Sequence, residues 1–89
     1  MGAKIRNSMA LRRLQKVQLP QHDSLGRTKR NLDILIESLE NDSIGDEEAF
    51  NDLASVVGTF KDARKTHDLY TDDVNDVMDE LVAIVEALR

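Results

Sequence analysis

Residues 71–89 carry the strongest structural signal in the chain, a single apolar stripe at helical spacing. Thr71 suits the N-cap of a helix, and Asp72 and Asp73 place negative charge at the positive end of the helix dipole. The apolar residues that follow are three or four positions apart: Val74, Val77, Met78, Leu81, Ile84, Val85 and Leu88. At about 100° per residue they share one broad face. The sequence therefore predicts a helix over about 72–88 that is buried against other helices.

Two further segments show the same kind of periodicity. The first runs over about 24–41, where Asp23 or Ser24 can cap the helix start. Its stripe repeats partly every seven residues: Leu25, Thr28, Leu32, Leu35, Ile36 and Leu39. Ile34 lies well off this stripe, so we expect it to meet a second neighbour.

The second segment runs over about 47–67, with Asp46 as its expected cap. Its apolar face consists of Ala49, Phe50, Leu53, Val56, Val57, Phe60 and Ala63. Short polar connections on both sides of this helix predict that the three helices run antiparallel, because short loops join antiparallel neighbours.

The N-terminal residues 3–18 have helix-forming composition but poor periodicity, since Arg12 and Arg13 separate the apolar positions. Pro20 is expected to end this helix, because proline inside a helix removes a hydrogen bond and clashes with the preceding turn. We predict either a fourth packed helix or a projecting arm.

The predicted fold class is therefore all-α: a small antiparallel bundle of three helices with a basic N-terminal helix or arm. A chain of 89 residues is one domain at most. Within it the sequence suggests two parts, a basic N-terminal helix or arm with its hinge over 1–22 and an acidic helical bundle over 23–89.

The formal net charge of -5 conceals a strong asymmetry along the chain. Residues 1–30 hold eight lysines and arginines against one acid, whereas residues 31–89 hold four against sixteen acids. A basic segment joined to an acidic body indicates an interaction role.

The sequence lacks the patterns that carry catalysis or tight ligand binding. It has no cysteine, no glycine-rich phosphate loop, no histidine pair at metal-ligand spacing and no complete calcium loop. Nor does it contain an apolar run long enough for a signal peptide or a membrane span. We therefore expect a cytoplasmic protein that is not an enzyme and has no metal, cofactor, membrane or small-molecule substrate.

The leading functional hypothesis is a non-catalytic protein–protein interaction module, a small adaptor, regulator or assembly component that also self-associates. Self-association is expected because the N-terminal apolar residues have no clear partner within so short a chain. The residues expected to contact the partner are Ile5, Met9, Arg12, Arg13, Leu14 and Lys16, with Ile34 as a second patch.

Four other interpretations remain open. The basic N-terminal arm could bind nucleic acid through its arginines and lysines as a regulator. It could instead clasp the acidic face of a bundle, within one chain or between subunits. It could also be a flexible, solvated tail. The acidic residues over 31–89 also permit a DNA-mimic inhibitor, although such mimics need dense charge over a larger surface.

Overall fold

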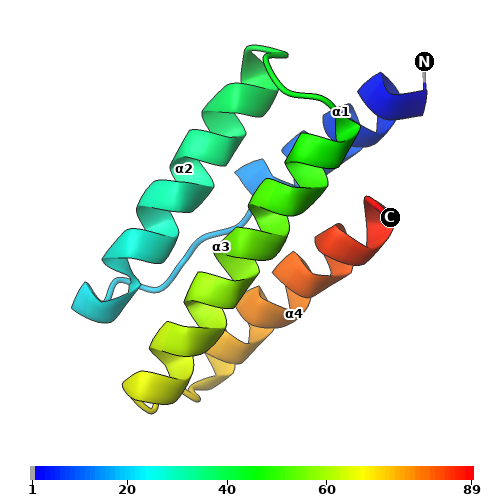
Figure 1. Cartoon of the computed structure of the whole chain (residues 1–89). Coiled ribbons are helices and arrows are strands. Elements are labelled where there is room, and N and C mark those ends of the chain that lie inside the picture. The colour runs from blue at the N-terminus through cyan, green and yellow to red at the C-terminus, as the bar shows by residue number, and fades with distance from the viewer. Residues whose placement is uncertain (1) are drawn as a thin grey trace.

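The computed structural model describes the backbone of residues 2–89 and the side chains from Asn7 onward. In this part of the chain the regular structure is helical, with four α-helices packed against one another (Figure 1). They are α1 (Gly2–Gln15), α2 (Gly26–Glu40), α3 (Asp46–Thr66) and α4 (Asp72–Ala87), and a short 3-10 helix, η1 (Asp23–Leu25), precedes α2. The prediction of an all-α fold is confirmed.

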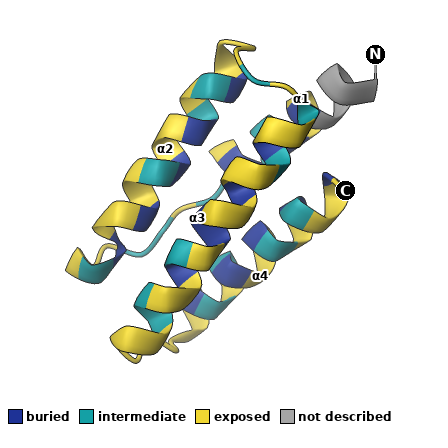
Figure 2. Ribbon diagram, in the orientation of Figure 1, coloured by how far each residue is buried: buried dark blue, intermediate teal, exposed yellow. Residues whose placement is uncertain are grey.

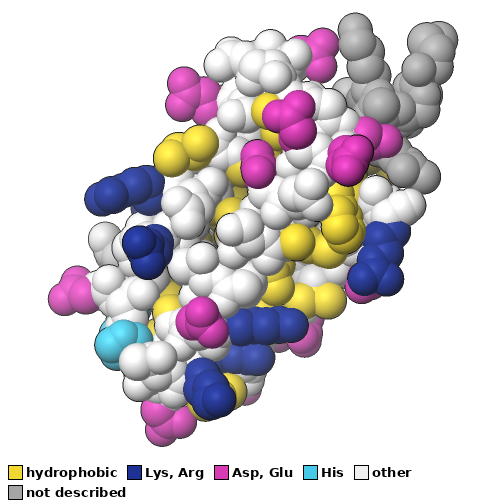
Figure 3. Space-filling view, viewed as in Figure 1, with side chains coloured by type: hydrophobic (Ala, Val, Ile, Leu, Met, Phe, Trp, Pro, Cys, Tyr) yellow, Lys and Arg dark blue, Asp and Glu magenta, His cyan; other side chains and the backbone are white. Residues whose placement is uncertain are grey.

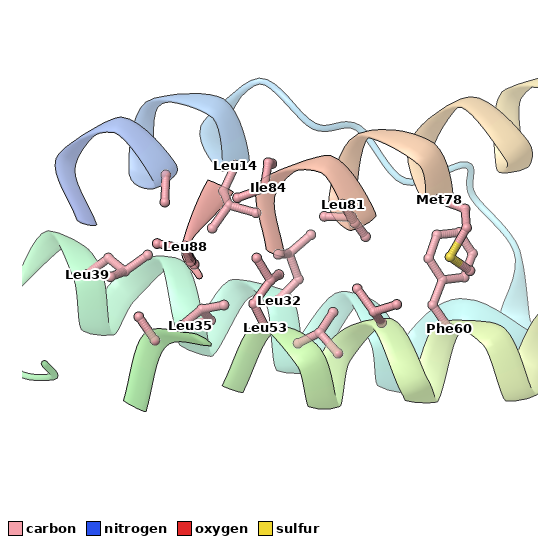
Figure 4. Packing of buried hydrophobic residues seen from close by; sticks show 14 of the residues in the cluster. Leu14, Leu32, Leu35, Leu39, Leu53, Phe60, Met78, Leu81, Ile84 and Leu88 are labelled. Atoms are coloured by element: carbon pink, nitrogen blue, oxygen red, sulfur yellow. The ribbon is translucent and has the colours of Figure 1, made fainter. Parts of the chain in front are cut away.

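The core is aliphatic and receives side chains from all four helices. The predicted stripes of α2, α3 and α4 point inward, as Figure 2 shows by the buried positions along the inner sides of the helices. Phe60 of α3 is fully buried and points toward Met78 of α4 at one end of the core (Figure 4). Because the stripes meet in one continuous cluster, the molecule has a single core.

The helix α1 packs as a fourth member of the bundle and does not project as an arm. Its backbone lies close to those of α2, α3 and α4, whereas no Cα pair of α2 and α4 comes within 8 Å in the part of the chain that is described. Ala10 and Leu14 of α1 are buried in the core, at 4% and 0% exposure. In Figure 4, Leu14 points toward Ile84 of α4. Ala10 and Leu14 therefore have packing partners within the chain, contrary to the expectation for the N-terminal apolar residues, whereas Met9 is exposed.

The end of α1 differs from the prediction. The helix ends at Gln15, well before Pro20, with a final tight turn in which the Val17 amide donates to the Leu14 carbonyl at 3.1 Å. Val17 and Leu19 then pack against the core while the chain crosses to η1. The helix therefore ends earlier than the predicted residue 18, where these side chains turn inward.

The helix starts also differ from the expected caps. At η1 the cap is His22, whose Nδ1 accepts a hydrogen bond from the Ser24 amide at 3.1 Å. At α3 the N-cap is Gly45, and the expected cap Asp46 is the first residue of the helix. An acidic first turn complements the helix dipole without side-chain capping, so α3 retains favourable electrostatics at its start.

At α4, Thr71 holds the predicted N-cap position but its side chain does not cap the backbone. Its hydroxyl instead donates to Asp73 Oδ1 at 2.5 Å, and the same oxygen accepts from the Val74 amide at 3.0 Å. Hydrogen bonds to a carboxylate favour its charged form. The Thr71 hydroxyl, with a smaller contribution from the Val74 amide, lowers the pKa of Asp73 below its ordinary value.

Both α2 and α3 end with an aspartate in the left-handed region, at φ 52° for Asp42 and φ 54° for Asp68. The hydrogen bonds that follow are those of a Schellman ending: the Ser43 amide donates to the Ser38 carbonyl, and the Leu69 amide donates to the Arg64 carbonyl. Glycine usually holds this position, because a Cβ is strained there.

Candidate functional site

The predicted contact residues of α1 are divided between core and surface. Leu14 is fully buried and so cannot contact a partner on the folded protein, because its side chain is already packed in the core. Met9 is 62% exposed, and Arg12 and Lys16 are exposed as well. The side chain of Ile5 lies outside the described residues.

Arg13 binds α1 to the acidic helix α4. Its Nε donates to Glu80 Oε1 at 3.1 Å, and its Nη2 donates to the same oxygen. Nearby, Gln15 Nε2 donates to Glu40 Oε2 of α2 at 3.1 Å. The Arg13 and Glu80 side chains are 40% and 45% exposed, so solvent screens this pair and its contribution to stability is at most about 1 kcal/mol. These two hydrogen bonds join the basic N-terminal helix to acidic side chains of α2 and α4, which is the kind of contact that a clasp within one chain requires.

On the other side of the bundle, Ile34 lies at the edge of a hollow between α2 and α3. Its side chain is 56% exposed, although it is a large β-branched apolar group. The hollow has a volume of about 260 Å³. Its lining residues are Asn31, Ile34, Leu35, Asp52, Ser55 and Val56. The floor is therefore apolar, and the rim carries polar groups from both helices.

A second hollow lies on the other flank of α3, against α4, with a volume of about 240 Å³. Its lining residues are Ala54, Val57, Gly58, Lys61, Val82, Val85 and Glu86. Figure 3 shows hydrophobic side chains gathered along the border between α3 and α4 on this side of the molecule. Apolar side chains thus reach the surface on both flanks of α3.

The sequence pattern did not predict this second hollow. Val82 lies at the edge of the apolar stripe of α4 and is partly buried against the core, whereas Ile34 lies well outside the stripe of α2 and is exposed. Ile34 therefore gave a sequence signal of an apolar group at the surface, and Val82 did not.

At the junction of α3 and α4, Arg64 contacts Asn75 and Tyr70. Its Nη1 donates to Asn75 Oδ1 at 3.1 Å, and its guanidinium lies 5.2 Å from the centre of the Tyr70 ring. A cation over an aromatic face is attracted by the ring quadrupole. Tyr70 remains 53% exposed, but this contact accounts for its position.

Among the described residues, no group of three or more histidine, cysteine or acidic side chains is arranged to hold a metal ion. Among the same residues, no helix combines the length and apolar character needed to cross a bilayer.

Comparison of the chain with models of known protein families, with curated proteins and with solved structures gave no match.

Proposed function

We propose that the chain is a non-catalytic protein–protein interaction module, a small adaptor, regulator or assembly component. In this proposal α2, α3 and α4 form an antiparallel bundle, joined by the short connections over 41–45 and 67–71. The surface that binds the partner lies on α2 and α3, around Ile34.

The exposure of Ile34 carries the proposal. Because Ile34 is 56% exposed, burying the rest of its side chain in a partner stabilises a complex by up to about 1.5 kcal/mol, before the costs of association. The hollow beside it gives a partner side chain an apolar floor to fill. A protruding apolar group next to a hollow is the arrangement that binding hot spots use.

The packing of α1 favours this location over the N-terminal helix. Leu14 and Ala10 are buried in the core, and Arg13 is hydrogen-bonded to Glu80, so these side chains are not free to bind a partner. Met9, Arg12 and Lys16 remain as a second exposed surface on α1.

A nucleic-acid role is the second candidate, favoured by one specific observation. Arg12 at the end of α1 and Lys16 just after it are exposed, and Arg27 and Arg30 are exposed on α2. Phosphate binding by these side chains would weaken steeply with salt, whereas an apolar protein contact would change little.

The test is affinity capture from the native host with the tagged full-length chain, with and without nuclease. Proteins retained after nuclease treatment by the parent, but lost with an Ile34→Glu bait, would support the proposal. Met9→Glu is the matched control, because Met9 is similarly exposed but lies on α1 at its border with α4, away from Ile34 and beside Ile84 and Leu88. Capture that disappears with nuclease, or equal capture by the Ile34→Glu bait, would overturn the proposal.

A further inference from the structure

We infer that the partner of this surface is a second copy of the chain, docked along α3. The surface, called here the α3 face, comprises the exposed side of α3 with Ile34 on one flank and Val82 and Val85 on the other. Figure 1 shows α3 in front of its neighbours. One apolar hollow borders α2 on one flank of α3, and the other borders α4 on the opposite flank. The inference rests on the proposed function and names its partner.

The charges along α3 identify a second copy as the occupant. Glu47 and Glu48 are exposed near the start of the helix. Lys61 and Lys65 are exposed near its end, with the exposed Asp62 between them, so this end is basic on balance. On this face, Figure 3 shows acidic side chains around the start of α3, and lysine or arginine side chains with some acidic ones among them around its end. Arg64 does not contribute, because it is held by Asn75 within the chain.

A surface that is acidic at one end and basic at the other complements itself when it is turned end to end. Two copies of α3 packed antiparallel about a two-fold axis would place Glu47 of each copy opposite Lys65 of the other. Such an interface is isologous, so each favourable contact occurs twice. A parallel arrangement would instead bring acid to acid and base to base.

The apolar groups beside α3 lie level with the middle of the helix, where the two copies would meet. Both hollows border the middle of α3, one beside Ser55 and Val56 and the other beside Val57 and Gly58. With the two-fold axis at mid-helix, Ile34 of each copy lies at the centre of the interface and the charges lie at its ends. Apolar groups at the centre and charged groups at the rim are the usual anatomy of a protein interface.

Gly58 is consistent with close approach of a second helix at this point. It lies inside α3 with ordinary helical geometry, and a Cβ added there would meet nothing within 4 Å. Nothing within the chain therefore requires a glycine, which weakens an isolated helix. A neighbouring α3 crossing at mid-helix would use the space.

The test is sedimentation velocity of the purified full-length chain and two charge-reversed variants. One variant carries Glu47→Lys and Glu48→Lys, and the other carries Lys61→Glu and Lys65→Glu. The parent is expected to dimerise. Each variant alone is expected to dimerise at least tenfold more weakly at low salt, because both ends of its α3 then carry the same sign. Mixed together, the two variants are expected to form a heterodimer, since one α3 is basic at both ends and the other is acidic.

Formation of the heterodimer would exclude misfolding as the reason why each variant alone dimerises weakly, because two unfolded variants would not associate on mixing. An Arg12→Glu, Lys16→Glu variant is the control on α1 and should dimerise like the parent. A parent that stays monomeric at millimolar concentration, or variants that dimerise normally, or a mixture without heterodimer, would each overturn the inference. A monomeric parent that still captures another protein through Ile34 would reject the second copy and leave the proposed function standing.

Discussion

Replacing Leu14 by alanine tests whether α1 is a structural part of the bundle. Leu14 is fully buried, so the substitution removes three carbon atoms from the core. At about 0.8 kcal/mol per buried carbon the transfer loss alone is about 2.4 kcal/mol. The cavity left behind raises the expected cost toward the range of about 2–5 kcal/mol seen for such truncations.

The assay is urea unfolding followed by circular dichroism, with the free energy of unfolding extrapolated to water. A domain of this length has roughly 4–13 kcal/mol of stability, so Leu14→Ala should remain partly or wholly folded at low temperature. The matched control is Arg12→Ala on the exposed side of the same helix, which should change the free energy of unfolding by less than about 0.5 kcal/mol.

A cost below about 1 kcal/mol for Leu14→Ala would refute the placement of α1, because a residue on a loosely attached arm loses little on truncation. A cost in the expected range, with Arg12→Ala near zero, separates the core role of Leu14 from the surface role that its position in the basic segment suggested.

Three smaller predictions follow from local structure. Thr28→Val should raise the free energy of unfolding by about 1 kcal/mol, because the buried Thr28 hydroxyl has no hydrogen-bond partner among the described residues. Asp68→Gly should raise it by about 0.5–1 kcal/mol, because glycine adopts φ 54° without strain. Thr71→Val should raise the pKa of Asp73 toward its ordinary value, as followed by NMR titration of the carboxyl carbon, because the hydroxyl that lowers it is removed. Since the folded-state pKa of Asp73 is depressed, its stabilising contribution is present above the ordinary pKa of 3.8 and is lost as the pH falls below it.

Each of these has a clear contrary result. The two stability predictions are measured by urea unfolding. A Thr28→Val variant that is less stable than the parent would mean that the hydroxyl is satisfied in solution, for example by water. No gain from Asp68→Gly would show that the aspartate side chain compensates for its backbone strain. An unchanged titration of Asp73 in Thr71→Val would show that the backbone amide of Val74, and not the hydroxyl, sets the shift.

The bundle could be predicted from sequence because three of its helices carry broad apolar faces. Each stripe contains residues such as Leu32, Leu53 and Leu81 that are buried as the helix period requires. A local pattern of this kind depends only on the geometry of one helix. The helix ends were less predictable, since His22 caps its turn through a side chain that propensity rules do not favour.

The role of α1 could not be derived from its own pattern. Its periodicity is weak because only a narrow strip, including Ala10 and Leu14, is buried. Its polar contacts join residues far apart in the sequence, such as Arg13 and Glu80. These pairings depend on how the helices are arranged in space. Among the expected contact residues, only the off-stripe position of Ile34 gave a local signal of surface exposure.

The most direct test of the account is an NMR dilution series on the isotope-labelled chain, which locates any self-contact residue by residue. The account predicts that signals of Ile34, Gly58, Val82 and Val85 shift with concentration, while those of Arg12 on α1 stay constant. Signal shifts confined to α1, with the signals of the α3 face unchanged, would contradict the account and would show that self-contact occurs through the N-terminal helix.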